Sequence, residues 1–203
     1  MSGAKLLYTD YFAPNPAFPD DPLFRRRFRM RKPLFLRIME GVEAHDDYFK
    51  LTRDCCRQLS FSSKQKCMAA LRMLALGTAA DAVGEMVRMG ESMCLKTTVK
   101  FACAVVEEFG PEYLIEPNAQ DTKKLLAIGD ARGFPGMLGS IDCMHWQWKN
   151  CPKGLREMYQ GHTREATIIP EAVTSHGLWI WHAFFGMSGS HNEINVFQRS
   201  PVF

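Results

Sequence analysis

The chain has 203 residues, of which 46% are hydrophobic and 23% charged, the balance of a soluble globular protein. Its formal net charge of +3 is too small to identify a polyanionic partner by itself. No apolar run has the roughly 18 residues of a membrane span, and no signal-peptide core is present, so we expect a nuclear or cytoplasmic protein with no membrane partner. The seven scattered cysteines form no C-x-x-C pair, so we expect free thiols.

The N-terminal segment is predicted to be an irregular arm over residues 1–22, because it contains Pro14, Pro16 and Pro19. A helix is then expected to begin at Asp21-Pro22. Basic residues crowd the following turn, and two interpretations are open: a solvated basic face, or a contact to a phosphate backbone. These residues are Arg25, Arg26, Arg27, Arg29, Arg31 and Lys32.

Further helices are predicted after Pro33. Ser62 and Gln65 form a capping box before a helix that ends at Gly77, and a short helix over 79–87 follows. A long helix over 92–109 comes next, ended by Gly110-Pro111. Helix, turn and helix outline a helix-turn-helix unit, whose second helix places polar residues in the major groove. The predicted nucleic-acid contacts are Ser92, Lys96, Thr97 and Lys100, whereas Val99, Cys103 and Val106 are expected to face the core.

The pattern changes from helical to β-rich after a last helix over 119–132, which Asn118 caps. The runs 137–144, 167–175 and 178–185 predict a meander of three antiparallel strands. Asp142 lies near the end of the first strand. A carboxylate in such an apolar run needs a cationic partner such as a divalent metal ion, unless it lies just past the strand and is solvated.

Four sequence blocks follow one another in order: Phe24–Met30, Arg132–Trp146, Leu178–Gly186 and Gly189–Val196. Together they resemble plant Harbinger-type transposases of the DDE superfamily. The resemblance implies a ribonuclease-H-like nuclease domain in which Asp142 is the first metal-binding aspartate. Glu193 stands where that family has its next acidic residue, an aspartate. Glutamate binds the same metals, and the alternative for Glu193 is a first-turn helix carboxylate that faces the helix dipole.

The resemblance also implies the function of a DNA endonuclease that uses Mg²⁺ or Mn²⁺, with Asp142 and Glu193 as metal ligands. It further implies DNA and a Myb-like accessory protein as partners, and a nuclear location. The family continues with a strand that ends in Gly-Asp and a helix that carries a catalytic glutamate, both absent here. We therefore expect a C-terminally truncated, catalytically impaired member. The alternative is a non-catalytic DNA- or protein-binding module.

The predicted fold class is α+β. Residues 1–22 form the arm, and 23–116 form a helical, helix-turn-helix-like DNA-binding region. Residues 117–203 form an incomplete ribonuclease-H-like domain with its first three strands and one helix.

Overall fold

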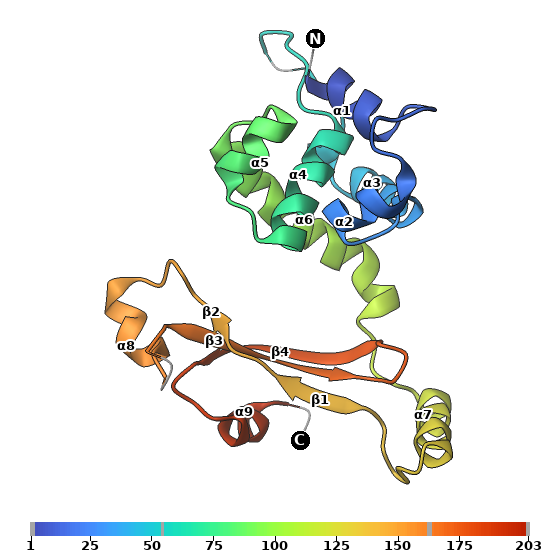
Figure 1. The fold of residues 1–203 in the computed structure, drawn as a ribbon, viewed down its shortest axis with the longest axis vertical. Coiled ribbons are helices and arrows are strands. Elements are labelled where there is room, and N and C mark those ends of the chain that lie inside the picture. Colours follow the sequence, from blue (N-terminus) through green and yellow to red (C-terminus); the bar gives the residue numbers. More distant parts are fainter. Residues whose placement is uncertain (1–2, 54, 162–163, 202–203) are drawn as a thin grey trace. The chain divides into compact units, whose positions relative to one another are not determined.

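The computed structural model describes residues 3–53, 55–161 and 164–201 (Figure 1). The chain divides into two compact units, Met1–Tyr113 (unit 1) and Leu114–Phe203 (unit 2). Unit 1 is helical, and unit 2 contains an antiparallel sheet, so the predicted α+β class is confirmed. None of the helices in the described ranges has the length and apolar character needed to cross a membrane.

The N-terminal segment is irregular only over residues 12–19, which contain the three prolines, because helix α1 covers Gly3–Tyr11. Leu7 and Tyr11, one turn apart, are both buried in the core of unit 1. The Tyr11 ring packs edge-on against Phe28, with 5.6 Å between ring centroids. This contact joins segments 17 residues apart along the chain, so the local proline pattern could not reveal it.

Two short helical segments and one longer helix follow: η1 (Asp20–Phe24), α2 (Arg25–Phe28) and α3 (Lys32–His45). Phe24, Phe28 and Phe35 are fully buried, and their ring centroids lie 4.6 to 5.5 Å apart. Aromatic pairs at such distances add about 0.5–1.5 kcal/mol each beyond their buried area. The three rings therefore fix which side of α2 faces the interior.

The remaining elements of unit 1 are η2 (Asp47–Phe49), α4 (Ser63–Leu76), α5 (Ala80–Val87) and α6 (Glu91–Tyr113). The predicted capping box of α4 is confirmed, because Ser62 Oγ accepts a hydrogen bond from Gln65 N and Gln65 Oε1 accepts one from Ser62 N. Gly77 ends this helix in the left-handed conformation, with φ of +60°, as predicted.

Helix α6 runs past Pro111, whereas the sequence predicted an end at Gly110-Pro111. Two contacts from α3 hold the last turn in place. Arg37 donates hydrogen bonds to the Glu112 carboxylate at 3.0 Å and to the Tyr113 hydroxyl at 2.9 Å. Proline removes one backbone donor there, and these exposed side-chain contacts compensate for only part of that loss.

The predicted core face of α6 is wrong. Val99 and Val106 are 65% and 56% exposed, and Cys103 is exposed as well. The helix carries apolar residues on two faces, and the sequence does not show which face meets its neighbours. The buried positions are Cys94, Thr97, Phe101 and Ala104.

Unit 2 begins with α7 (Ala119–Ala131), whose N-terminus Asn118 caps as predicted. The other elements are β1 (Ser140–Cys143), β2 (Trp146–Gln147), η3 (Lys153–Leu155), α8 (Arg156–Tyr159), β3 (Thr167–Thr174), β4 (Ile180–Ser188) and α9 (Glu193–Arg199). Strands β1 and β2 pair with one edge of β3, and β4 pairs with its other edge, all antiparallel. The predicted meander is therefore confirmed.

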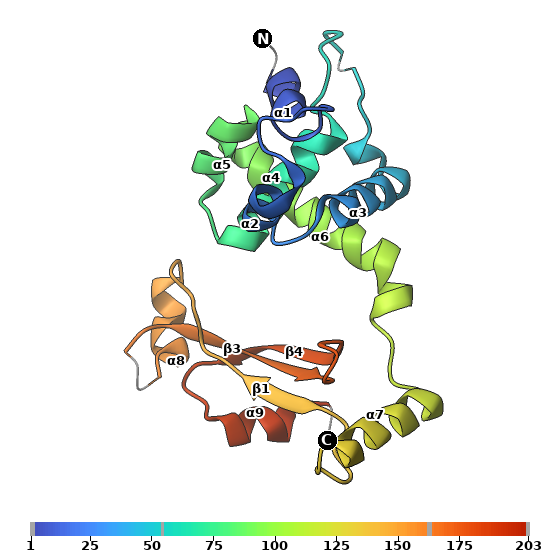
Figure 2. The same cartoon turned by 45° about the vertical axis from the view of Figure 1, so that its right-hand side comes forward.

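Helix α9 lies along one face of this sheet (Figure 2). Its Val196 is fully buried and packs with Ile169 of β3 and Met187 of β4. Cys143 of β1 and Phe184 of β4 border the same apolar cluster. The sheet thus has one face covered by a helix, which so few short strands need in order to be stable.

A buried carboxylate ties the end of α9 to the sheet. Glu171 of β3 is 1% exposed, and its Oε1 accepts a hydrogen bond of 2.7 Å from the Ser200 hydroxyl. His182 Nε2 lies 4.0 Å from the same oxygen. The second oxygen, Oε2, is buried and has no hydrogen-bond partner among the residues that the structure describes. The Ser200 hydroxyl is therefore the main donor to this carboxylate.

Replacing Ser200 by alanine is expected to destabilise unit 2 by about 1–3 kcal/mol, because a buried carboxylate then loses its closest donor. All four tryptophans of the chain, Trp146, Trp148, Trp179 and Trp181, lie in unit 2, so urea unfolding followed by tryptophan fluorescence measures this unit alone. Ser140→Ala, at an exposed position of β1, is the matched control and should change the free energy of unfolding by less than about 0.5 kcal/mol. Equal effects of the two substitutions would contradict the anchoring role.

Candidate nucleic-acid interface

The basic segment, defined as residues 25–32, presents four exposed arginines. Phe24 and Phe28 point into the core, so the opposite side of α2 faces solvent. Within the described ranges, no carboxylate lies at ion-pair distance from any of the four. Their positive charge is therefore available to an external anion. They are Arg25, Arg26, Arg29 and Arg31.

Arg27 differs from its neighbours because it packs against the aromatic cluster of unit 1. It is half-buried, and its guanidinium lies 3.9 Å from the centroid of the Phe18 ring. It also donates a hydrogen bond to the Tyr11 hydroxyl. A cation–π contact of this kind stabilises a fold by about 0.5–2 kcal/mol. The structure gives the predicted contact residue Arg27 a packing role.

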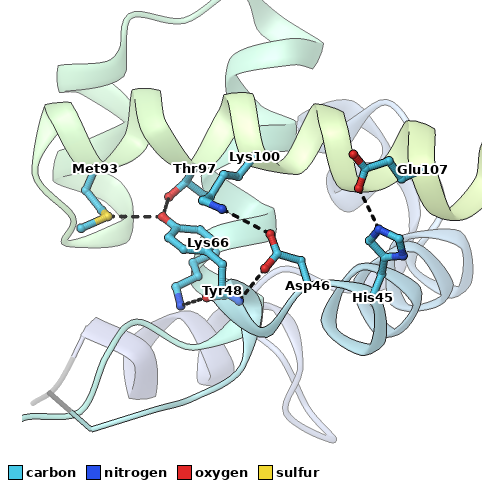
Figure 3. Close-up of polar contacts among 8 residues, drawn as sticks. All are labelled: His45, Asp46, Tyr48, Lys66, Met93, Thr97, Lys100 and Glu107. Carbon is cyan, nitrogen blue, oxygen red and sulfur yellow. Dashed lines mark hydrogen bonds and ion pairs between the residues drawn. The ribbon is translucent and has the colours of Figure 1, made fainter.

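The four predicted contact residues of α6 lie in different environments. Ser92 and Lys96 are exposed at the start of the helix. Thr97 is fully buried, so its hydroxyl is not available at the surface that the prediction assigned to it. Lys100 Nζ lies 3.5 Å from Asp46 Oδ2, an ion pair within unit 1 (Figure 3). Only two of the four side chains are thus free of internal polar contacts in the described part of the chain.

A polar network around Tyr48 explains the burial of Thr97. The Tyr48 hydroxyl lies 2.6 Å from Thr97 Oγ1 and 3.3 Å from Met93 Sδ, which joins η2 to α6 (Figure 3). The Tyr48 carbonyl accepts a hydrogen bond of 2.6 Å from Lys66 Nζ of α4. Lys66 is 4% exposed, and burial lowers the pKa of its ammonium group. The network connects three elements of unit 1, and no sequence motif pointed to it.

Asp46 belongs to the same network. Its Oδ1 accepts a hydrogen bond of 2.8 Å from Tyr48 N, and Lys100 lies beside its other oxygen. The backbone hydrogen bond, and then the charge of Lys100, lower the pKa of this carboxyl below its ordinary value of 3.8. Asp46 is thereby kept ionised as the cap of η2.

Asp142, the first predicted metal ligand, lies in the exposed strand β1. It pairs with Ala172 of β3, whereas its neighbour Cys143 pairs with Glu171. Because successive side chains on a strand point to opposite faces, Asp142 faces away from the side that α9 covers. The buried environment expected for this carboxylate is therefore wrong: Asp142 is exposed.

Glu193, the second predicted ligand, is the first residue of α9. Asn192 caps the helix, and its side chain accepts a hydrogen bond of 2.9 Å from Asn195 N. The side chain of Glu193 lies outside what the structure describes, so its convergence with Asp142 stays a prediction. A position in the first helical turn agrees with the alternative interpretation of this residue.

The donors that the structure describes do not by themselves form a metal centre. No three His, Cys, Asp or Glu side chains come together in a group able to hold a metal ion, within the described ranges. Mg²⁺ requires near-octahedral coordination, and one exposed carboxylate supplies at most two of the oxygens.

Two protein-family models match the chain. Residues 111–203, which include all of unit 2, match a family described as plant transposon protein. Residues 3–43, from α1 to α3, match a domain of unknown function, DUF8418. No curated protein and no solved structure matches the chain. The first match supports the transposon-derived character that the sequence predicted.

His45, at the end of α3, joins that helix to α6. Its Nε2 lies 2.8 Å from Glu107 Oε2 (Figure 3), and its Nδ1 lies 3.3 Å from Glu108 Oε2. The hydrogen bond to Glu107 is the largest cause that raises the pKa of His45 above its ordinary value of 6.5. The contact therefore stabilises unit 1 fully below the unfolded pKa, and this contribution is lost as the pH rises through the folded pKa.

Glu107→Gln is expected to lower the pKa of His45 toward 6.5, measured by NMR titration of the imidazole. Glu108→Gln is the matched control and should lower it less, because Glu108 contributes less to the shift. In the parent chain, the free energy of unfolding of unit 1 should fall as the pH rises above the ordinary His pKa of 6.5 and through the raised pKa of folded His45, and His45→Gln should flatten this dependence. A pKa of His45 at or below 6.5 in the parent would refute the pairing.

Proposed function

We propose that this transposon-derived chain binds DNA through its basic segment. One observation carries the proposal: four exposed arginines in residues 25–31, none paired with a carboxylate of the described chain. Arginine suits phosphate because its planar guanidinium donates two parallel hydrogen bonds to phosphate oxygens. The burial of Phe24 and Phe28 holds the segment in one orientation, which reduces the entropy lost on binding.

The long helix α6 contributes less to this proposed interface than a recognition helix would. Only Ser92 and Lys96 of its four predicted contacts are exposed. Phosphate contacts position a protein on DNA without reading its sequence. The proposed binding is therefore largely independent of sequence, which fits the Myb-like accessory partner and the nuclear location that the Harbinger resemblance implies.

A metal-dependent nuclease activity is the second candidate function. It rests on the exposed Asp142 carboxylate, which lies in the part of the chain that matches the plant transposon protein family. In this proposal Asp142 and Glu193 are ligands of Mg²⁺ or Mn²⁺. The non-catalytic alternative retains DNA binding alone.

Replacing Arg25, Arg26 and Arg29 by glutamine should reduce the salt dependence of DNA affinity. The slope of log K against log salt concentration should fall by about 0.9 for each phosphate that the protein no longer neutralises. Fluorescence anisotropy with a labelled duplex at several salt concentrations measures this slope. The control variant replaces Lys5, Lys123 and Lys124 by glutamine and so removes the same total charge from exposed positions outside the basic segment. The same slope in the arginine variant and the parent would exclude the segment from the interface.

Replacing Asp142 by asparagine should abolish Mn²⁺ binding measured by isothermal titration calorimetry, while the fold is retained. An exposed carboxylate contributes little to stability, so the free energy of unfolding should change by less than about 0.5 kcal/mol. Asp130→Asn, at an exposed position of α7, is the matched control and should bind Mn²⁺ like the parent. If Asp142→Asn and the parent bind Mn²⁺ equally, Asp142 is not a ligand.

A further inference from the structure

Helix α6 has a second apolar face, which points away from the core of unit 1. We call it the outer stripe. Leu95, Val99 and Val106 are 50%, 65% and 56% exposed, values far above those of the buried face of the same helix. Ala102 and Cys103 lie between them and are exposed as well. A helix that is apolar on two opposite faces normally meets a partner on both.

The spacing of the outer stripe fits packing against another helix. Leu95, Val99, Ala102 and Val106 follow one another at intervals of four, three and four residues. This is the repeat that keeps an apolar seam directed toward a neighbouring helix over several turns. Ala102, the smallest of the four, lies near the middle, where a small side chain allows two helices to approach closely.

Charges at the two ends of the stripe indicate the direction of the pairing. Lys96 is exposed near the N-terminal end. Near the C-terminal end, the Glu107 side chain contacts His45 through Oε2 and is still 64% exposed, so it can also face a partner. Along the helix axis they lie about 9 Å and about 7.5 Å from Ala102. When two copies of α6 pair antiparallel about Ala102, Lys96 of each copy therefore meets Glu107 of the other. A parallel pair would place like charges together instead.

We propose that the outer stripe is a homodimer interface, in which α6 pairs antiparallel with α6 of a second copy of this chain. The antiparallel arrangement is two-fold symmetric, so the same patch serves both copies and the assembly closes as a dimer. By symmetry, the dimer contains two ion pairs between Lys96 of one copy and Glu107 of the other. The proposal does not depend on DNA binding, because it uses none of the arginines of the basic segment.

Sedimentation equilibrium of the full chain tests the proposal. The parent is expected to dimerise at concentrations on the order of 100 µM or below. Val99→Lys together with Val106→Lys should weaken association by more than about 100-fold, since each substitution acts twice in a symmetric interface. Circular dichroism should be unchanged, because both positions are exposed. Leu114→Lys, at a position 70% exposed outside the stripe, is the control and should leave association unchanged.

A charge exchange tests the direction of the pairing. Lys96→Glu alone and Glu107→Lys alone should each weaken the dimer by roughly 3- to 10-fold, and the double variant should restore it, because the opposite charges meet again. Glu107→Lys also removes the contact with His45, and His45→Gln, which removes that contact alone, should leave association unchanged. A parent that stays monomeric, or a dimer that survives the two valine substitutions, overturns the proposal. A double variant that associates as weakly as the single ones overturns the antiparallel arrangement.

Discussion

The burial of Phe24, Phe28 and Phe35 is the interaction on which the first unit depends. The centroids of these rings lie at most 5.5 Å from one another, and the rings determine which side of α2 is turned inward. The arginines that lie between them in the sequence are consequently turned outward, apart from Arg27. Hydrophobic packing thus creates the charged surface, and a change in the rings would alter that surface even if every arginine were kept.

Local signals in the sequence predicted much of the fold. The caps at Ser62, Gly77 and Asn118 were predicted correctly, because each depends on residues that are neighbours along the chain. The strands of the meander were predicted from their composition and from the tight turn between two of them. Helix α1 was missed because its stability comes from Tyr11 packing on distant rings, which no local pattern records.

The candidate sites were less predictable, since they depend on which side of an element is covered. Six basic residues looked equivalent in the sequence, and the contacts of Arg27 with Phe18 and Tyr11 separate it from the four exposed arginines. The sequence predicted that Thr97 lies at the surface of α6, but in the structure its side chain is buried against the hydroxyl of Tyr48. Asp142 lies in an apolar run, yet the sheet exposes it, because α9 covers the other face.

The burial of Lys66 has a consequence for chemical reactivity. Acylating reagents modify exposed lysine amines, but the Nζ of Lys66 is enclosed and bound to the Tyr48 carbonyl. Its modification therefore requires that η2 and α4 separate. The rate at which Lys66 becomes labelled, compared with the labelling rate of exposed lysines such as Lys96, would therefore report how often unit 1 opens under native conditions.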